Sequence, residues 1–211
     1  MKIALINGSP KHKNSSSGNL LKLLSSKLQE KNTIEEYIFR TSEISSNDLE
    51  QISKCNVIVF AFPLYVDGIP SHLLRCLYQM EKYLSYDKSN EIYVYAIVNA
   101  GFYEGKQAYI AIDMMKNWAE KANIKWGQGI GIGGGGMISM IEKSTDSQGP
   151  MKSVHTTLAS LADNILSSKS SYELYTTPGI PRLVYKVGGE MGWRQAAKKN
   201  GLKTKDLFKV K

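Results

Sequence analysis

Apolar and polar positions follow two patterns that alternate along the chain. Short segments predict strands at 2–6, 34–39, 57–62, 92–99 and 125–132, and several of them are nearly continuous apolar runs rich in Val and Ile, as expected for strands buried on both faces of a sheet. Between them, apolar residues spaced three or four positions apart predict amphipathic helices, at 18–31, 46–53, 70–84, 105–122 and 150–168. The first helix illustrates the pattern, because Leu20, Leu24 and Leu28 fall on one face.

This alternation predicts an α/β domain in which helices cover both faces of a parallel sheet, a three-layer doubly wound fold. Right-handed crossovers leave few strand orders, and we expect five strands in the flavodoxin-like order 2-1-3-4-5. In that order ligands bind beyond the carboxyl ends of the first and third strands. The loops at 9–19 and 63–68 should therefore share one site, with the loop at 99–105 beside them.

The loop after the first strand has the composition of a phosphate site. Its hydroxyls come from Ser9, Ser15, Ser16 and Ser17, and it leads directly into a helix N-terminus. Neither of the common glycine-rich nucleotide motifs occurs between residues 7 and 20. Hydroxyls and amides near a helix dipole suit a phosphate monoester. The alternative is an ordinary serine-rich turn.

Two further loops have the composition of a site for a flat ring. The loop at 62–70 is apolar and aromatic where exposed loops are normally polar, so Tyr65 is a candidate for stacking and its neighbours for backbone contacts. The loop at 99–105 has glycines at both ends of Phe102 and Tyr103, which could cover a ring. The alternative for the first of these loops is packing under a neighbouring helix.

A glycine run at 131–137 follows the fifth strand. It contains a literal G-x-G-x-x-G, but it lies late in the sheet and lacks the helix and acidic residue of a dinucleotide site. We interpret it as a flexible loop that shapes the pocket rim or contacts another subunit.

Composition excludes several classes of protein. The 211 residues are 42% hydrophobic and 22% charged, which indicates a globular chain. Cys55 and Cys76 match no metal or redox spacing, and three scattered histidines predict no metal site. No apolar run approaches the roughly 20 residues that span a membrane, and there is no leader-like start, so we expect a cytoplasmic protein without an integral membrane segment. No nucleophile elbow supports a hydrolase.

The charge is concentrated in the C-terminal part of the chain. Residues 169–211 contain ten Lys or Arg against three acidic residues, a balance of +7 out of a total of +8. We therefore divide the chain into a domain at 1–168 and a basic, aromatic extension at 169–211. The extension could face solvent, lie on a membrane surface or pack on a subunit, and packing on a subunit or on itself is favoured over a membrane. No nucleic-acid motif occurs, so no nucleic-acid partner is expected.

Three segments, NGSPK, FPLYVDGIPSHL and NAGFYEG, resemble the flavodoxin-like NAD(P)H-dependent FMN reductases over residues 1–168. The resemblance implies FMN as cofactor, NADH or NADPH as co-substrate, and a homodimer or higher homo-oligomer. It implicates fifteen residues in holding FMN: Ser9, Lys11, Ser15, Ser17, Gly18, Asn19, Pro63, Leu64, Tyr65, Val66, Asp67, Asn99, Gly101, Phe102 and Gly105. Two distant cysteines cannot supply the iron–sulfur cluster of some relatives.

The resulting hypothesis is an FMN-dependent NAD(P)H oxidoreductase that reduces a small acceptor, such as a quinone, a flavin, an azo or a nitro compound, by hydride transfer. Because the cofactor performs this chemistry, no side chain is assigned a catalytic role. The alternative is a flavodoxin-like electron carrier without NAD(P)H turnover, although such carriers tend to be acidic and this chain is basic. A flavin-free binding or regulatory domain is a third possibility.

Overall fold

The computed structural model describes residues 1–29, 32–85, 91–138 and 149–209. Its internal contacts divide the chain into two units, Met1–Pro178 and Gly179–Lys211, and each is described by itself. The last two residues of the helix that the sequence predicts at 18–31 lie outside the described residues.

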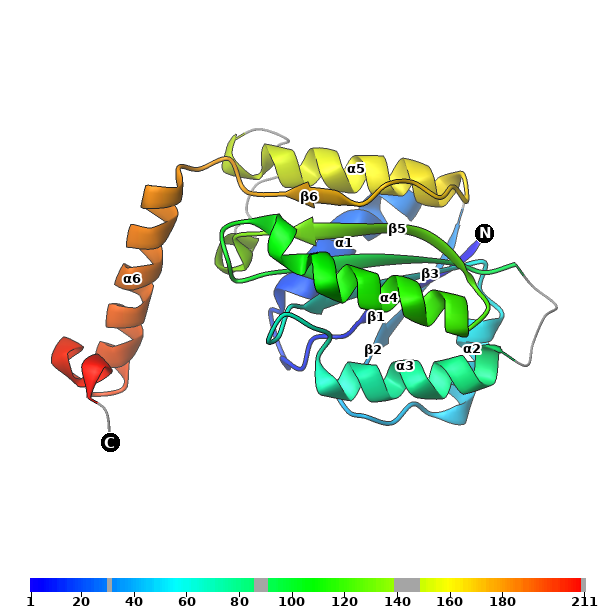
Figure 1. The fold of residues 1–211 in the computed structure, drawn as a ribbon, viewed down its shortest axis with the longest axis horizontal. Helices are drawn as coiled ribbons and strands as arrows, with labels where there is room; N and C mark the ends of the chain where they lie inside the picture. The colour runs from blue at the N-terminus through cyan, green and yellow to red at the C-terminus, as the bar shows by residue number, and fades with distance from the viewer. Residues whose placement is uncertain (30–31, 86–90, 139–148, 210–211) are drawn as a thin grey trace. The chain divides into compact units, whose positions relative to one another are not determined.

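The first unit is built on a parallel sheet (Figure 1). In the part of the chain that the structure describes, six strands run in the order β2-β1-β3-β4-β5-β6. Their bounds are β1 Lys2–Asn7, β2 Thr33–Ile38, β3 Val57–Pro63, β4 Tyr93–Asn99, β5 Lys125–Ile132 and β6 Leu174–Thr176. The five predicted strands and their order are confirmed, with each end within one residue of its expected position.

The expectation of five strands is wrong, because β6 adds a sixth at the edge of the sheet. It pairs with β5 in parallel, with Ile130 opposite Leu174. The chain already lies along β5 before β6 begins. The Ser171 N–H donates to the Gly127 carbonyl at 2.9 Å, and the Gln128 side chain donates to the Tyr172 carbonyl. A strand of only three residues has too few positions to show a period, so its sequence carries no signal.

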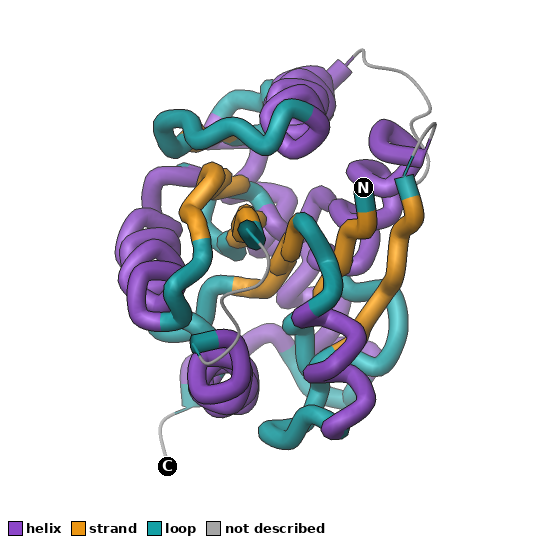
Figure 2. Tube along the Cα trace, turned by 90° about the vertical axis from the view of Figure 1, so that its right-hand side faces the viewer, coloured by secondary structure: helices purple, strands orange, loops and turns teal. Residues whose placement is uncertain are grey.

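Helices cover both faces of the sheet (Figure 1 and Figure 2). The helices of this unit are α1 Ser16–Leu28, α2 Ser46–Ser53, α3 Ser71–Leu84, α4 Tyr109–Lys121 and α5 Lys152–Leu166, with 3₁₀ turns η2 Gly105–Ala108 and η4 Gly149–Met151. Alternate strand residues face opposite cores: Phe60 packs with α3 and α4, whereas Val59 packs with α1 and α5. The interior strands β1, β3 and β4 are therefore buried on both faces, as their apolar runs predict, whereas the edge strand β2 is only partly buried.

Serine side chains set the starts of α1 and α2. The Ser15 hydroxyl accepts a hydrogen bond from the Gly18 N–H at 3.0 Å, and the Ser45 hydroxyl accepts one from the Asp48 N–H at 3.0 Å. Because Ser15 is the N-cap, α1 begins two residues before the predicted start at Gly18. This difference matters for the site, because Ser16 and Ser17 become its first-turn residues.

The second unit contains helix α6 Arg182–Lys199 and the 3₁₀ turn η5 Thr204–Phe208. Gly201 ends α6 in the left-handed region at φ 72°, and the Leu202 N–H donates to the Ala197 carbonyl at 3.0 Å. Of the residues of α6, all of which are described, only Ala197 is buried. Among the described residues of both units, no helix is long and apolar enough to cross a membrane.

Candidate functional site

Four loops meet beyond the carboxyl ends of β1, β3, β4 and β5. Backbone hydrogen bonds join neighbouring loops: the Gly8 N–H donates to the Ala61 carbonyl at 2.8 Å, and the Leu64 N–H donates to the Asn99 carbonyl at 2.9 Å. The strand order reverses between β1 and β3, which is the position where open α/β sheets bind ligands. The loops that the sequence analysis places at one site therefore lie next to one another at this edge of the sheet.

These loops enclose a hollow of about 300 Å³. Residues from all four loops line it: Ser9, Lys11, Ser16, Ser17, Pro63, Leu64, Tyr65, Asn99, Gly101, Gly135 and Gly136. The β1–α1 loop contributes hydroxyls and an ammonium group, and the β3–α3 loop contributes an apolar and aromatic wall. We call this hollow the loop pocket.

Asn7 organises the polar loop after β1. Its side-chain oxygen accepts a hydrogen bond from the Ser9 N–H at 3.0 Å, and its amide nitrogen donates to the Ser15 hydroxyl at 3.2 Å. Ser15 also accepts from Gly18, so its hydroxyl serves the loop and the helix cap and does not line the loop pocket. Sequence reasoning passed over Asn7, although Asn directly after a buried strand is a signal for such a local network.

A buried hydrogen bond connects α1 to β4 at the loop pocket. The Ser17 hydroxyl donates to the side-chain oxygen of Asn99 at 2.7 Å. Both residues line the pocket and both are buried. This bond fixes the distance between the polar loop and the end of β4.

Arg40, just beyond β2, adds a cationic group that the sequence analysis did not select. Its guanidinium donates to the backbone carbonyls of Lys11 at 3.4 Å and His12 at 3.1 Å. The side chain therefore contacts the polar loop from outside and brings positive charge to it. Two carbonyl contacts position a loop, and the charge favours an anion near it.

The loop after β3 ends in a tight turn. Tyr65 and Gly68 exchange backbone hydrogen bonds of 3.1 and 3.0 Å, and Val66 and Asp67 have φ angles of 48° and 58°. Positive φ at both central residues is the geometry of a type I′ turn, where a β-branched residue is strained. Val66 is fully exposed at the tip, so the strain is not offset by packing.

The glycine run after β5 is closely packed. The Gly134 N–H donates to the Phe102 carbonyl at 2.6 Å, and the Gly135 N–H donates to the Ala100 carbonyl at 2.7 Å. A Cβ at Gly133 would overlap the Tyr103 carbonyl oxygen. The Ser16 hydroxyl also donates to the Gly135 carbonyl at 3.1 Å. The run therefore forms a wall of the pocket because backbone must approach backbone there.

The loop pocket unites eight of the fifteen residues that the resemblance implicates: Ser9, Lys11, Ser17, Pro63, Leu64, Tyr65, Asn99 and Gly101. The other seven lie outside its lining: Ser15, Gly18, Asn19, Val66, Asp67, Phe102 and Gly105. A Cβ at Gly105 would overlap the Thr176 carbonyl of β6, so this glycine serves the packing of η2 on the sheet. Ser16, Gly135 and Gly136 also line the pocket. They are not among the fifteen, although the sequence analysis named Ser16 as a loop hydroxyl and the glycine run as a possible pocket rim.

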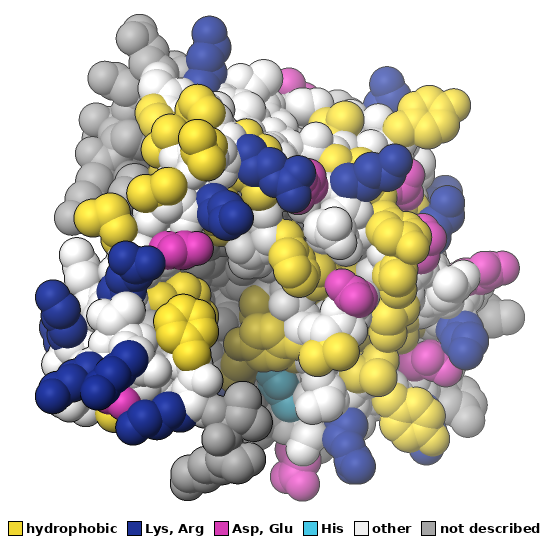
Figure 3. All heavy atoms as spheres, turned by 60° about the vertical axis from the view of Figure 1, so that its left-hand side comes forward, with side chains coloured by type: hydrophobic (Ala, Val, Ile, Leu, Met, Phe, Trp, Pro, Cys, Tyr) yellow, Lys and Arg dark blue, Asp and Glu magenta, His cyan; other side chains and the backbone are white. Residues whose placement is uncertain are grey.

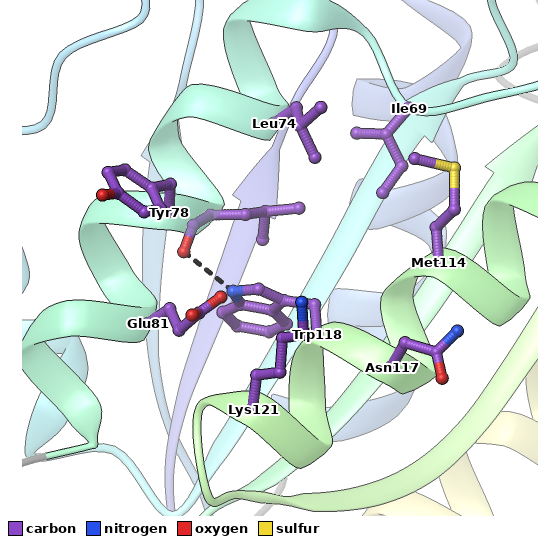
Figure 4. Close-up of a pocket in the computed structure, with 9 residues that line it drawn as sticks. Ile69, Leu74, Tyr78, Glu81, Met114, Asn117, Trp118 and Lys121 are labelled. Atoms are coloured by element: carbon purple, nitrogen blue, oxygen red, sulfur yellow. Dashed lines mark hydrogen bonds between the residues drawn. The ribbon is translucent and has the colours of Figure 1, made fainter.

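A second hollow of about 320 Å³ lies between α3 and α4 (Figure 4). Its lining is mostly apolar, and Trp118 forms part of it while its indole N–H donates to the Leu77 carbonyl at 2.8 Å. Glu81 and Lys121 are its charged residues. It has no hydroxyl cluster and no helix N-terminus, so it lacks the groups that would hold a phosphate.

Both thiols are unsuited to chemistry in the folded protein. Burial raises the pKa of Cys55 and of Cys76 to about 11, so each is a neutral thiol near pH 7. Neither lines the loop pocket. Among the described residues, no group of three His, Cys, Asp or Glu side chains is placed to hold a metal ion.

The fold belongs to the flavodoxin-like class of three-layer α/β folds. No protein-family model matches the sequence, and no curated protein matches it. Among solved structures, the chain is similar to an NAD(P)H:quinone oxidoreductase from Methanothermobacter marburgensis, with 16% identity, a TM-score of 0.58, and coverage of 78% of this chain and 96% of that one.

Two further structures share the fold. An NADH:FMN oxidoreductase in its apo form has 13% identity and a TM-score of 0.58, covering 81% of this chain and 90% of that one. A short-chain flavodoxin associated with a bacterial microcompartment has 13% identity and a TM-score of 0.54, covering 81% of this chain and 100% of that one. The comparisons thus support the resemblance at the level of the fold, which the two oxidoreductases and the flavodoxin share.

Proposed function

We propose that this protein is an FMN-dependent NAD(P)H oxidoreductase that reduces a small acceptor. The observation that carries the proposal is the loop pocket, which joins a hydroxyl-rich helix N-terminus to an apolar, aromatic wall within one hollow. A ligand that has a phosphate attached to a flat ring system would contact both the polar end and the apolar wall, and few other ligands would. From the resemblance we keep a quinone, flavin, azo or nitro compound as acceptor, and a cytoplasmic homodimer.

The polar end of the loop pocket fits a phosphate monoester. Ser9 brings a hydroxyl to this end, and the N–H groups of Ser16 and Ser17, in the first turn of α1, have no acceptor within the helix. The hydroxyls of Ser16 and Ser17 already donate to the Gly135 carbonyl and to the Asn99 side chain, so the backbone of these residues is what faces the phosphate as donor. Lys11 lines the same end, and Arg40 holds the Lys11 carbonyl from the other side. A helix dipole, a hydroxyl and two nearby cations together favour a dianion.

The opposite end fits the isoalloxazine ring. Pro63 and Leu64 form an apolar wall, and the half-exposed Tyr65 lies beside them. Phe102 is 56% exposed on the neighbouring loop, outside the lining, and is available to a second molecule that enters from solvent. When bound, FMN would supply hydride transfer from NADH or NADPH to the acceptor. The role of these side chains is to orient the two rings and exclude water between them.

The function is tested on the purified full-length protein, reconstituted with FMN. We expect flavin absorbance to remain with the protein after gel filtration, and to bleach within seconds when NADH or NADPH is added without oxygen. A yellow protein that neither nucleotide bleaches would favour the electron carrier. A protein that never retains FMN would contradict both readings.

The position of the phosphate can be tested separately from activity. Ser16 is half-buried in the first turn of α1, so Ser16→Asp places a carboxylate where the phosphate should lie. The carboxylate gains about 0.5 kcal/mol from the helix dipole but loses the hydrogen bond that the Ser16 hydroxyl donates to the Gly135 carbonyl, so the stability of the ligand-free protein should not rise, while charge repulsion weakens FMN binding. Ser46→Asp, at the first residue of α2, is the matched control: it makes the same dipole interaction away from the loop pocket.

Fluorescence titration of FMN measures the affinity, and thermal unfolding of the ligand-free protein measures the stability. We expect Ser16→Asp to raise the dissociation constant at least tenfold while Ser46→Asp leaves it unchanged. Equal FMN affinity in the two variants would place the phosphate elsewhere.

A further inference from the structure

The second unit carries nearly all of the net charge of the protein. Gly179–Lys211 contains nine Lys or Arg against Glu190 and Asp206, a balance of +7, whereas Met1–Pro178 contains eighteen against seventeen, a balance of +1. Both acidic residues are already paired, Glu190 with Arg194 at 3.4 Å and Asp206 with Lys209 at 2.8 Å. The unit therefore presents an excess of cations, which selects an anionic partner.

The same unit exposes apolar side chains in a regular pattern. Leu183, Val187 and Met191 recur every four residues along the N-terminal half of α6, with exposed fractions of 72%, 51% and 56%. This short stripe ends at Met191, because Arg194 and Lys198 follow on the same side of the helix. Trp193 and Phe208 are also exposed, at 72% and 80%. Figure 3 shows one face of the molecule, on which hydrophobic side chains lie exposed among Lys and Arg. A small anion or a phosphate backbone would use the cations and leave the apolar groups in water.

Helix α6 has low intrinsic helix propensity and little packing inside its own unit. Gly188, Gly189 and Gly192 interrupt it, and glycine is the least helix-favouring residue after proline. Only Ala197 is buried, so the helix gains almost nothing from packing inside its own unit. Helices in proteins obtain most of their stability from an apolar surface that covers one face. Such a surface must come from outside Gly179–Lys211.

We propose that Gly179–Lys211 binds the surface of an anionic lipid bilayer, with the Leu183–Val187–Met191 stripe in the acyl boundary and the cations at the lipid phosphates. A helix that lies in the bilayer interface buries its apolar side chains at the acyl boundary while its Lys and Arg side chains contact anionic lipid headgroups. The charged residues of α6 and its lack of a spanning apolar segment mean that it lies on the bilayer and does not cross it. A second copy of this chain fits less well, because its second unit has the same charge and its first unit has no anionic excess.

Vesicle binding of the full-length protein tests the proposal. We expect the protein to co-sediment with vesicles of phosphatidylcholine plus phosphatidylglycerol, to stay in solution with phosphatidylcholine alone, and to dissociate as salt rises. Lys198→Gln with Lys199→Gln should lower the partition coefficient about tenfold or more. The matched control is Lys116→Gln with Lys121→Gln in α4, which makes the same change of net charge in the first unit and should change the partition little.

A spectroscopic readout locates the contact. The emission of Trp193 should shift to shorter wavelength on the anionic vesicles, and Trp193→Phe should remove the shift. Equal binding to both vesicle types, no binding, or equal losses in the two lysine pairs would overturn the proposal. So would binding of an oligonucleotide in place of vesicles, or a change from dimer to monomer in the Lys198 and Lys199 variant without any vesicle binding.

Discussion

The buried hydrogen bond between Ser17 and Asn99 offers a direct test of how the loop pocket is held together. Ser17→Ala removes the hydroxyl that donates to the Asn99 side-chain oxygen at 2.7 Å. Both residues are buried, although both also line the pocket. The oxygen of Asn99 is then left without this donor at the end of β4, next to the pocket.

The expected cost follows from the burial. A lost hydrogen bond that leaves a buried acceptor unsatisfied costs about 2 kcal/mol of unfolding free energy. For a unit the size of Met1–Pro178 this corresponds to a fall in melting temperature of about 4–8 °C. Because the bond also sets the distance between the polar loop and β4, we expect FMN affinity to fall together with stability.

Ser25→Ala is the matched control. Ser25 is a buried serine on the same helix, but its hydroxyl accepts a long bond of 3.5 Å from the Gln29 side chain and does not line the loop pocket. Thermal unfolding and FMN titration of both variants provide the measurement. Equal changes in the two variants would refute the reasoning, since the Ser17–Asn99 bond would then contribute nothing beyond an ordinary buried hydroxyl.

Three further predictions follow from the backbone and from burial. Gly133→Ala should destabilise the protein by about 1–3 kcal/mol in denaturant unfolding because its Cβ meets a backbone carbonyl, whereas Gly136→Ala, with open space around its Cβ, should be nearly neutral. Val66→Asn should stabilise the protein by about 1 kcal/mol in the same assay, because asparagine tolerates a φ of 48° better than valine does; a loss of stability would argue against the turn. Burial raises the pKa of Cys55 and Cys76 from 9.0 to about 11, so folding favours the neutral thiols. The contribution of these thiols to the free energy of unfolding is complete below pH 9 and should be lost as the pH rises towards 11. Thiol labelling near pH 8 should accordingly be slow until denaturant is added.

The order of elements in the sheet could be derived from the sequence because three of the interior strands, β1, β3 and β4, are nearly continuous apolar runs. The runs at β1, β3 and β4 are buried on both faces, and the helices between them have one apolar face, so burial leaves a clear trace in the residue types. The edge strand β6 left no such trace, because it has only three residues and is held by pairing with β5.

The place of the candidate site was also determined by the sequence, since the carboxyl ends of parallel strands meet at one edge. The hydrogen-bond partners of the residues in this site could not be determined from the sequence. Ser15 and Ser17 are both serines of one loop, yet one caps a helix and the other binds Asn99, 82 positions away. Likewise the glycine run packs closely against residues 100–103 and forms one wall of the pocket, although its composition suggested a flexible loop. Local sequence patterns therefore predict the helices, the strands and the kind of side chain in each loop. They do not predict which of several similar hydroxyls makes a given hydrogen bond, or where two backbone segments must approach closely. Those contacts join segments that are distant in the sequence, and only the tertiary structure brings them together.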